Sequence, residues 1–237
     1  MYTEAIKTAL EANGVTVNTP QARLLSAYLE ELLTVNKTTN LTAIREPEEA
    51  IVKHLADCAV CIDAIPPHAT LLDVGSGAGL PAFPFAILRP DITVTALDST
   101  GKKVAFITST ANKLGLDNLK ALHCRAEELA HNRSYRERYT VVSARAVARM
   151  NLLAELCLPF VKVGGIFLAM KSRMAEEELI EALGGIGTLG GKPRESKEIA
   201  LVGGDSDAAR TLIVIDKIRR TPPTFPRAYA RMSAKPL

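Results

Sequence analysis

A glycine-rich turn is the part of this sequence whose residue types and spacing most directly suggest chemistry. It runs Asp73-Val74-Gly75-Ser76-Gly77-Ala78-Gly79 and follows the apolar pair Leu71-Leu72. Glycine lacks a Cβ and adopts positive φ, so backbone N–H groups in such a turn can approach a bulky ligand. The spacing is G-x-G-x-G, whereas dinucleotide-binding turns read G-x-G-x-x-G, and Leu80 stands where their third glycine would be. The alternative is a plain strand-to-helix turn without a ligand.

Acidic residues near the turn indicate which ligand it would hold. Asp73 lies two residues before Gly75 and favours a cationic ligand, such as the amino and sulfonium groups of S-adenosyl-L-methionine. Asp98 lies twenty-three residues after Gly75, where a carboxylate can accept hydrogen bonds from ribose hydroxyls. Backbone groups of Arg125-Ala126-Glu127 could bind an adenine edge, although Glu127 could equally be an acid that favours a helix start.

The elements that must position these residues alternate along the chain. Apolar stretches at 71–74, 92–97, 119–124, 139–143 and 165–170 read as strands, and helices are expected between and after them at 81–88, 102–114, 127–129, 152–160 and 175–183. This alternation predicts a parallel, doubly wound α/β sheet, with ligands beyond the carboxyl ends of its strands. Two more strands, at 198–202 and 211–218, have no helix between them and predict an antiparallel hairpin at one edge.

The first part of the chain reads as helical. Helices are expected over 4–12, from the Thr19-Pro20 start through Leu33, and over 48–62. The polar segment 36–42 is expected to connect two helices and to contain residues for binding a partner more than residues for core packing. We therefore expect a helical extension over residues 1–67 and an α/β domain with a basic tail over 68–237.

Composition limits the class of protein. The chain has 237 residues, of which 47% are hydrophobic and 23% charged, as in globular proteins. It has no uncharged apolar stretch of the roughly 18 residues needed to span a membrane, and Glu4, Lys7 and Glu11 argue against a secretory signal. We expect a cytoplasmic monomer. Cys58-x-x-Cys61 falls in a helical apolar pattern, which favours core cysteines over a metal or redox site.

Positive charge is concentrated at the end of the chain. From Arg210 to Leu237 there are seven basic residues and one acidic residue, a net charge of +6, while the rest of the chain carries −3. Phe225 and Tyr229 are interleaved with these cations. The pattern fits a phosphate-rich partner such as a nucleic acid, although a solvated edge strand with a soluble tail would look similar.

Several motifs resemble one protein family along nearly the whole chain. It is the family of bacterial 16S ribosomal RNA guanine-N7 methyltransferases, formerly called glucose-inhibited division protein B. The resembling segments are, in chain order, 40–44, His54-x-x-Asp57, the turn at 73–81, Leu97-Asp98-Ser99 with Lys102-Lys103, 125–127, 143–148, and the ending Phe225-Pro226-Arg227 with Lys235-Pro236-Leu237. The sequence departs from the family at Ala82-Phe83, where Gly-Ile is usual, at Cys58 in place of Ser, and at Phe225 in place of Tyr.

The resemblance implies a class I S-adenosylmethionine-dependent methyltransferase, with a Rossmann-like, mostly parallel sheet. It implies S-adenosyl-L-methionine as cofactor, S-adenosyl-L-homocysteine as product, and 16S ribosomal RNA or a small ribosomal subunit as partner. It also implies cofactor contacts at Gly75, Leu80, Asp98, Ala126, Glu127 and Arg145. With the residues of the turn and strand ends, the full expected cofactor set is Asp73, Gly75, Gly77, Gly79, Leu80, Asp98, Ser99, Ala126, Glu127 and Arg145.

The implied reaction needs no catalytic triad. Guanine N7 has a free lone pair, so alignment with the methyl group matters most and can contribute roughly 7–11 kcal/mol. An arginine can donate two hydrogen bonds to a guanine edge, although N7 itself must stay free. The catalytic candidates, on the guanine side, are in decreasing order Arg145, Arg149 and Lys171. We expect His54 to be structural rather than catalytic. The candidates for RNA phosphate contacts are Lys37, Asn40, Arg227, Arg231 and Lys235.

Two other functions use the same features. A nucleotide-dependent oxidoreductase would share the fold, but the missing third glycine and Asp73 argue against it. A non-enzymatic RNA-binding factor would need no cofactor turn, and the intact turn with Asp98 argues against that function.

Overall fold

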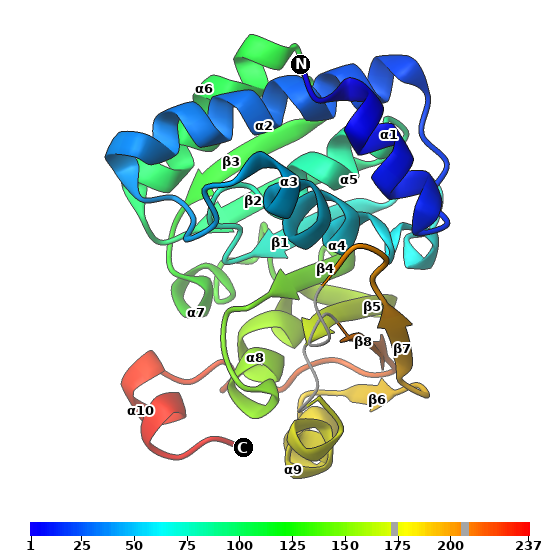
Figure 1. Cartoon of the computed structure of the whole chain (residues 1–237). Helices are drawn as coiled ribbons and strands as arrows, with labels where there is room; N and C mark the ends of the chain where they lie inside the picture. Colours follow the sequence, from blue (N-terminus) through cyan, green and yellow to red (C-terminus); the bar gives the residue numbers. More distant parts are fainter. Residues whose placement is uncertain (172–174, 205–208) are drawn as a thin grey trace.

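A computed structural model describes residues 1–171, 175–204 and 209–237, which form a central sheet between two layers of helices (Figure 1). The strand order is β3-β2-β1-β4-β5-β8-β6, with β7 paired to β8. The strands are β1 (Thr70–Val74), β2 (Thr93–Asp98), β3 (Leu119–His123), β4 (Tyr139–Arg145), β5 (Val161–Lys171), β6 (Gly191–Pro193), β7 (Lys197–Ala200) and β8 (Ala209–Lys217).

Strands β1 to β5 pair in parallel, and β8 runs antiparallel to β5. The order reverses between β1 and β4, which lie side by side in the middle of the sheet. This is the predicted doubly wound, Rossmann-like sheet. The predicted hairpin of 198–202 and 211–218 is confirmed as the antiparallel pair β7 and β8, although its connecting loop falls partly in 205–208, outside the described residues.

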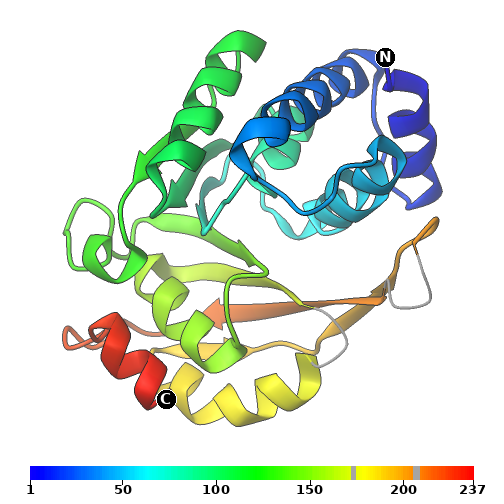
Figure 2. The same cartoon turned by 60° about the vertical axis from the view of Figure 1, so that its left-hand side comes forward.

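One face of the sheet is covered by the N-terminal helices together with two helices of the α/β units (Figure 2). These are α1 (Thr3–Ala12), α2 (Thr19–Thr39), α3 (Pro47–Ala50), the π-helix η1 (Ile51–Ala56), α4 (Asp57–Ala59), the 3-10 helix η2 (Ile62–Ala64), α5 (Ala82–Leu88) and α6 (Gly101–Leu114). The other face carries α7 (Ala126–Leu129), α8 (Met150–Cys157) with the 3-10 helix η3 (Leu158–Phe160), α9 (Ala175–Thr188) and α10 (Tyr229–Ala234).

Alternation along the central strands divides the hydrophobic core between the two faces. In β1, Leu71 packs into the core under the N-terminal helices, and its neighbour Leu72 packs into the core under α8 and α9. Val141 and Val142 of β4 divide in the same way. Successive side chains of a strand point to opposite faces, so a strand covered on both faces reads as a continuous apolar run.

Two predictions about the N-terminal region were wrong in detail. Asn18 rather than Thr19 caps α2, and its side chain accepts the N–H of Gln21 at 2.9 Å. The helix runs to Thr39, so most of the expected polar connector is helical. Asn36 is buried and accepts the N–H groups of Leu41 and Thr42, so its side chain shapes the turn after α2.

The expected core role of the paired cysteines is confirmed. Cys58 and Cys61 are free thiols with exposed fractions of 0% and 2%, packed under the N-terminal helices. Within the described ranges, no helix has both the length and the apolar character that crossing a membrane requires.

Candidate functional site

A cavity of about 300 Å³ opens beyond the carboxyl ends of β1, β2 and β3. Parallel strands bring their carboxyl ends to one edge, and the reversal of strand order between β1 and β4 leaves space there. The cavity is lined by Val74, Gly75, Leu97, Asp98, Ser99, Cys124, Arg125, Ala126, Glu127, Val147, Leu156 and Tyr229. Five expected cofactor residues thus lie together in it: Gly75, Asp98, Ser99, Ala126 and Glu127.

The glycine turn needs its glycines for two reasons. Gly75, Gly77 and Gly79 have φ values of 72°, 60° and 86°, which disfavour other residues. In addition, a Cβ on Gly75 would lie 2.6 Å from Val147 Cγ2, and a Cβ on Gly79 would lie 2.4 Å from the ring of Phe83. Phe83, which departs from the residue usual in the family, is therefore the side chain that excludes a Cβ at Gly79.

Asp98 connects the turn to the end of β2. Its carboxylate accepts the N–H of Gly77 at 2.9 Å and the N–H of Thr100 at 2.8 Å, while the residue lines the cavity. The turn is therefore held in shape by the same carboxylate that is expected to meet a ribose. Gly77, Gly79 and Leu80 lie behind this surface and do not line the cavity.

The far wall of the cavity contains a charged pair under an aromatic ring. Arg125 Nε lies 2.5 Å from Glu127 Oε1, and the Arg125 guanidinium carbon lies 5.0 Å from the ring centre of Tyr229. Glu127 is buried, whereas Arg125 is half exposed. Cation–π geometry of this kind holds the ring over the guanidinium.

Asp73 lies beneath the turn and not in the cavity. It is fully buried, and its Oδ1 accepts the Ser143 hydroxyl at 2.9 Å. Its Oδ2 has no hydrogen-bond partner among the described residues, and burial raises the pKa of this carboxyl to about 6. The expected direct contact between Asp73 and a cationic ligand is therefore not what this arrangement offers.

A second cavity, of about 240 Å³, lies on the other side of the segment that follows β4. Its lining residues are Asp57, Arg145, Ala146, Met170, Lys171 and Arg210. Arg145 Nη1 donates to Asp57 Oδ2 at 2.8 Å and to the Lys53 carbonyl at 3.0 Å, and Arg210 Nε donates to Asp57 Oδ1 at 2.8 Å. Arg145 therefore faces this second cavity and not the one around the glycine turn.

His54 supports Arg145 from the π-helix η1. Its Nε2 lies 2.8 Å from the Thr42 hydroxyl, and its Nδ1 lies 3.3 Å from Arg145 Nη2. Burial and the positive charge of Arg145 lower the pKa of His54 to about 4, which keeps the ring neutral at physiological pH. These contacts are those of the structural histidine expected from the sequence.

The other two catalytic candidates differ in position. Lys171 lines the second cavity, where its ammonium donates to the Ala148 carbonyl at 2.9 Å and pairs with Glu178 at 2.6 Å. Arg149 is exposed and pairs with Glu181 of α9 at 2.8 Å. The structure therefore brings Arg145 and Lys171 together and leaves Arg149 outside this cavity.

The expected RNA-contacting residues also divide. Lys37, Asn40, Arg231 and Lys235 are exposed. Arg227 instead forms an ion pair with Glu155 of α8, which is 1% exposed, through contacts of 2.6 and 2.9 Å. Its charge is therefore neutralised inside the protein.

The side chains that line the first cavity fit an adenosyl ligand. Apolar side chains of Val74, Leu97, Val147 and Leu156 suit a purine face, and Asp98 and Glu127 offer acceptors for hydroxyl and amino groups. Six lining residues were not among the cofactor contacts expected from the sequence: Val74, Leu97, Cys124, Val147, Leu156 and Tyr229. Val74, Leu97 and Val147 lie in motifs that the sequence analysis singled out, and Tyr229 is an aromatic residue among the cations of the tail, whereas Cys124 and Leu156 had no signal of their own.

Comparisons with known proteins agree with one another. The family described as rRNA small subunit methyltransferase G (GidB) matches residues 21–199. The ribosomal RNA small subunit methyltransferase G of Clostridium perfringens is 41% identical over 238 residues, covering 100% of this chain and 99% of that protein. Among solved structures, the fold is similar to that of precorrin-6y C5,15-methyltransferase from Geobacter metallireducens (TM-score 0.50, 15% identity, 76% and 92% of the two chains). It is equally similar to M. jannaschii TYW2 in complex with AdoMet (TM-score 0.50, 13% identity, 65% and 70%).

Proposed function

The chain belongs to the rRNA small subunit methyltransferase G family, and we propose that it methylates N7 of one guanosine in 16S ribosomal RNA. It is an S-adenosylmethionine-dependent methyltransferase. Membership of the family gives the reaction class, and the two cavities of this chain offer the residues that would perform the reaction.

The observation that carries the proposal is the position of two consecutive residues after β4. Val147 lines the cavity with the carboxylates Asp98 and Glu127, while Ala146 lines the cavity with Arg145 and Lys171. A methyl donor in the first cavity and an acceptor base in the second would meet at the edge of this short piece of backbone, where the methyl carbon and N7 must come into direct contact. Such proximity is what alignment of two reactants requires.

In the first cavity, Asp98 and Glu127 would accept hydrogen bonds from ribose and adenine groups, while the apolar wall excludes water. S-adenosyl-L-methionine supplies an electrophilic methyl group on a positively charged sulfur. Gly75, which lines the cavity, would let the backbone approach the amino-acid portion of the cofactor, while Gly77 and Gly79 shape the turn behind it. Asp73 would act from beneath the glycine turn, through its negative charge and through the hydrogen bond that it accepts from the Ser143 hydroxyl.

In the second cavity, Arg145 and Lys171 would hold the guanine. Both can donate to O6, which leaves N7 free to attack. The reaction moves positive charge from sulfur to the base, so the nearby carboxylate of Asp57 would stabilise the methylated guanine while keeping Arg145 in place. We place Arg149 with the exposed cations Lys37, Arg231 and Lys235, as phosphate contacts outside this cavity.

We further propose that the enzyme works as a cytoplasmic monomer on the small subunit or its precursor. All residues assigned above come from one chain, and the exposed cations suit a large phosphate-rich partner.

The test is to map 7-methylguanosine in 16S RNA after incubation with S-adenosyl-L-methionine, using both naked RNA and isolated small subunits. We expect one methylated guanosine with the wild type, a loss of at least 100-fold in rate with Arg145→Met, and little change with the exposed Arg133→Met. Methylation of another atom would overturn the N7 assignment. Full activity in Arg145→Met would overturn the role of the second cavity.

A further inference from the structure

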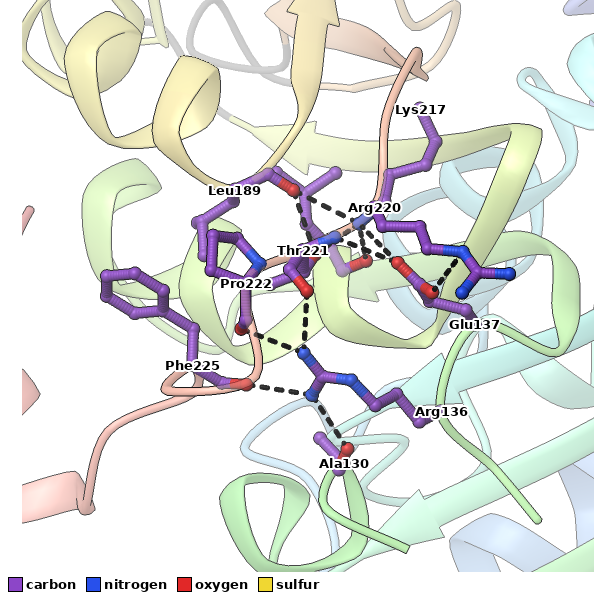
Figure 3. A network of polar contacts seen from close by, with 10 residues as sticks. Ala130, Arg136, Glu137, Leu189, Lys217, Arg220, Thr221, Pro222 and Phe225 are labelled. Carbon is purple, nitrogen blue, oxygen red and sulfur yellow. Dashed lines mark hydrogen bonds and ion pairs between the residues drawn. The ribbon is translucent and has the colours of Figure 1, made fainter. Parts of the chain in front are cut away.

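Arg136 lies in the turn between α7 and β4, and its guanidinium points at a bend of the C-terminal segment (Figure 3). It donates hydrogen bonds to the carbonyl oxygens of Phe225 at 2.8 Å, and of Thr221, Pro222 and Ala130 at 3.0 Å. A planar guanidinium can serve several acceptors lying on two sides of its fork, which a lysine ammonium cannot do in the same geometry. Three of the four acceptors belong to residues 221–225, so this arginine holds the shape of that bend.

The neighbouring Glu137 contacts the same bend (Figure 3). Its carboxylate accepts the N–H of Thr221 at 2.8 Å and lies 3.8 Å from the ammonium of Lys217. Lys217 is 1% exposed and donates to the carbonyl of Leu158 at 2.7 Å and to the Thr221 hydroxyl. The position of residues 217–225 is thus fixed by polar groups that lie mostly away from water, where such bonds are strong.

The chain leaves this bend and reaches the cofactor cavity within a few residues. His131 Nε2 lies 2.9 Å from the Pro226 carbonyl, and Arg227 pairs with Glu155. Helix α10 then begins at Tyr229, whose ring packs over Arg125 and lines the cavity. Since α10 has only six residues, it depends on these anchors more than on its own hydrogen bonds.

We propose that Arg136 is a positioning residue for the cofactor. It acts through the backbone of residues 221–225, which it holds so that Tyr229 forms the outer wall of the cofactor cavity. This inference rests on the proposed function, because it assumes that the cavity holds S-adenosyl-L-methionine or its product. The competing explanation is that Arg136 only stabilises the fold and has no effect on the cavity.

A double-mutant cycle separates the two explanations. The dissociation constant of S-adenosyl-L-homocysteine is measured by calorimetry for wild type, Arg136→Met, Tyr229→Ala and the double variant, at a temperature where each is folded. Each single variant is expected to bind about tenfold more weakly, because it removes or displaces the Tyr229 ring that forms the outer wall of the cavity. Because both substitutions remove the same wall, the double variant is expected to bind no more weakly than the worse single variant.

Two further measurements complete the design. Arg138→Met, two residues away and exposed, is the matched control and is expected to leave the affinity unchanged. Amide hydrogen exchange of peptides covering residues 221–234 is expected to be faster in Arg136→Met than in wild type, and no faster in Arg138→Met. Unchanged affinity in Arg136→Met, or losses that multiply in the double variant, would overturn the inference. Failure of the wild type to bind the ligand at all would instead overturn the proposed function.

Discussion

The hydroxyl of Tyr28 donates a hydrogen bond of 2.9 Å to the carbonyl oxygen of Ala78, which joins helix α2 to the glycine turn. The Tyr28 ring also stacks on Phe83, with 4.4 Å between ring centres, and both side chains are fully buried. Phe83 in turn fills the space beside Gly79. The N-terminal helices therefore hold the turn that borders the first cavity, the proposed cofactor site.

Removing only the Tyr28 hydroxyl tests this connection. Tyr28→Phe keeps the stacked ring but leaves a buried carbonyl without its donor, which costs about 1–3 kcal/mol of unfolding free energy. We expect weaker binding of S-adenosyl-L-homocysteine as well, since the turn loses a fixed point. Urea unfolding and calorimetry measure the two effects, with Tyr2→Phe as the control. Wild-type affinity in a destabilised Tyr28→Phe would show that the turn holds its shape without α2.

Gly79 and Gly184 should respond in opposite ways to the same substitution. Gly79→Ala places a Cβ at positive φ and against the Phe83 ring, and we expect a loss of about 1–3 kcal/mol. Gly184 lies exposed within α9 with nothing within 4 Å of its added Cβ, so Gly184→Ala should gain about 0.5–1 kcal/mol from helix propensity. Thermal unfolding of both variants is the measurement. Equal effects would contradict the steric argument.

Asp98→Asn tests the carboxylate at the end of β2. The amide keeps the size of the side chain but has one acceptor where the native residue has two, so the N–H of Gly77 or Thr100 loses its partner. We expect binding of S-adenosyl-L-homocysteine to weaken by at least tenfold, since a charged hydrogen bond contributes about 1.5–3 kcal/mol. The exposed Asp117→Asn, which should bind normally, is the control. Equal affinities of the two variants would exclude Asp98 from the site.

The sheet and the turn could be predicted from the sequence because their signals are local. Strands buried on both faces read as apolar runs, and the turn needs glycine at fixed places because of φ and the closeness of Val147 and Phe83. The two carboxylates of the cavity follow strand ends, whose position at one edge of the sheet follows from the topology.

What could not be predicted depends on contacts between distant parts of the chain. The glycines of α9 suggest a helix end near residue 183, yet the helix continues to Thr188, and a Cβ on Gly185 would lie 2.6 Å from Leu237 Cβ. The tail reads as a basic segment for RNA, but Lys217 and Arg227 point into the protein. Only the partners of these charges, Glu137 and Glu155, reveal that, and they lie far away in sequence.

The buried carboxyl of Asp73 predicts a pH dependence of stability. Burial raises its pKa from 3.8 to about 6, so between these pH values the folded protein holds a proton that the unfolded chain releases. Stability from this group is therefore lost as pH rises from about 4 to about 6. Asp73→Asn cannot ionise, so its unfolding free energy relative to wild type should rise by about 3 kcal/mol between pH 4 and pH 7.

Urea unfolding at several pH values measures this difference. His54, whose pKa is lowered to about 4, has the opposite dependence in the same range, but it is present in both proteins and cancels. A difference that stays constant with pH would mean that Asp73 is ionised in the folded protein over the whole range from pH 4 to pH 7, with its negative charge beneath the glycine turn.

Arg227 and Arg231 are close in sequence, but substitution of Arg227 should lower stability, whereas substitution of Arg231 should weaken RNA binding. Arg227→Ala leaves Glu155 buried without its partner, and we expect a loss of about 3 kcal/mol in unfolding free energy. Arg231 is exposed on α10, so Arg231→Ala should leave stability within about 0.5 kcal/mol of wild type. It should instead weaken binding to a 16S RNA fragment and reduce the slope of log K against log salt by about 0.7–1, as for one lost phosphate contact. Glu155→Gln with Arg227→Ala should recover part of the lost stability, since no unpaired charge is then buried. If the salt slope of Arg231→Ala equals that of the wild type, the RNA does not contact α10 through Arg231.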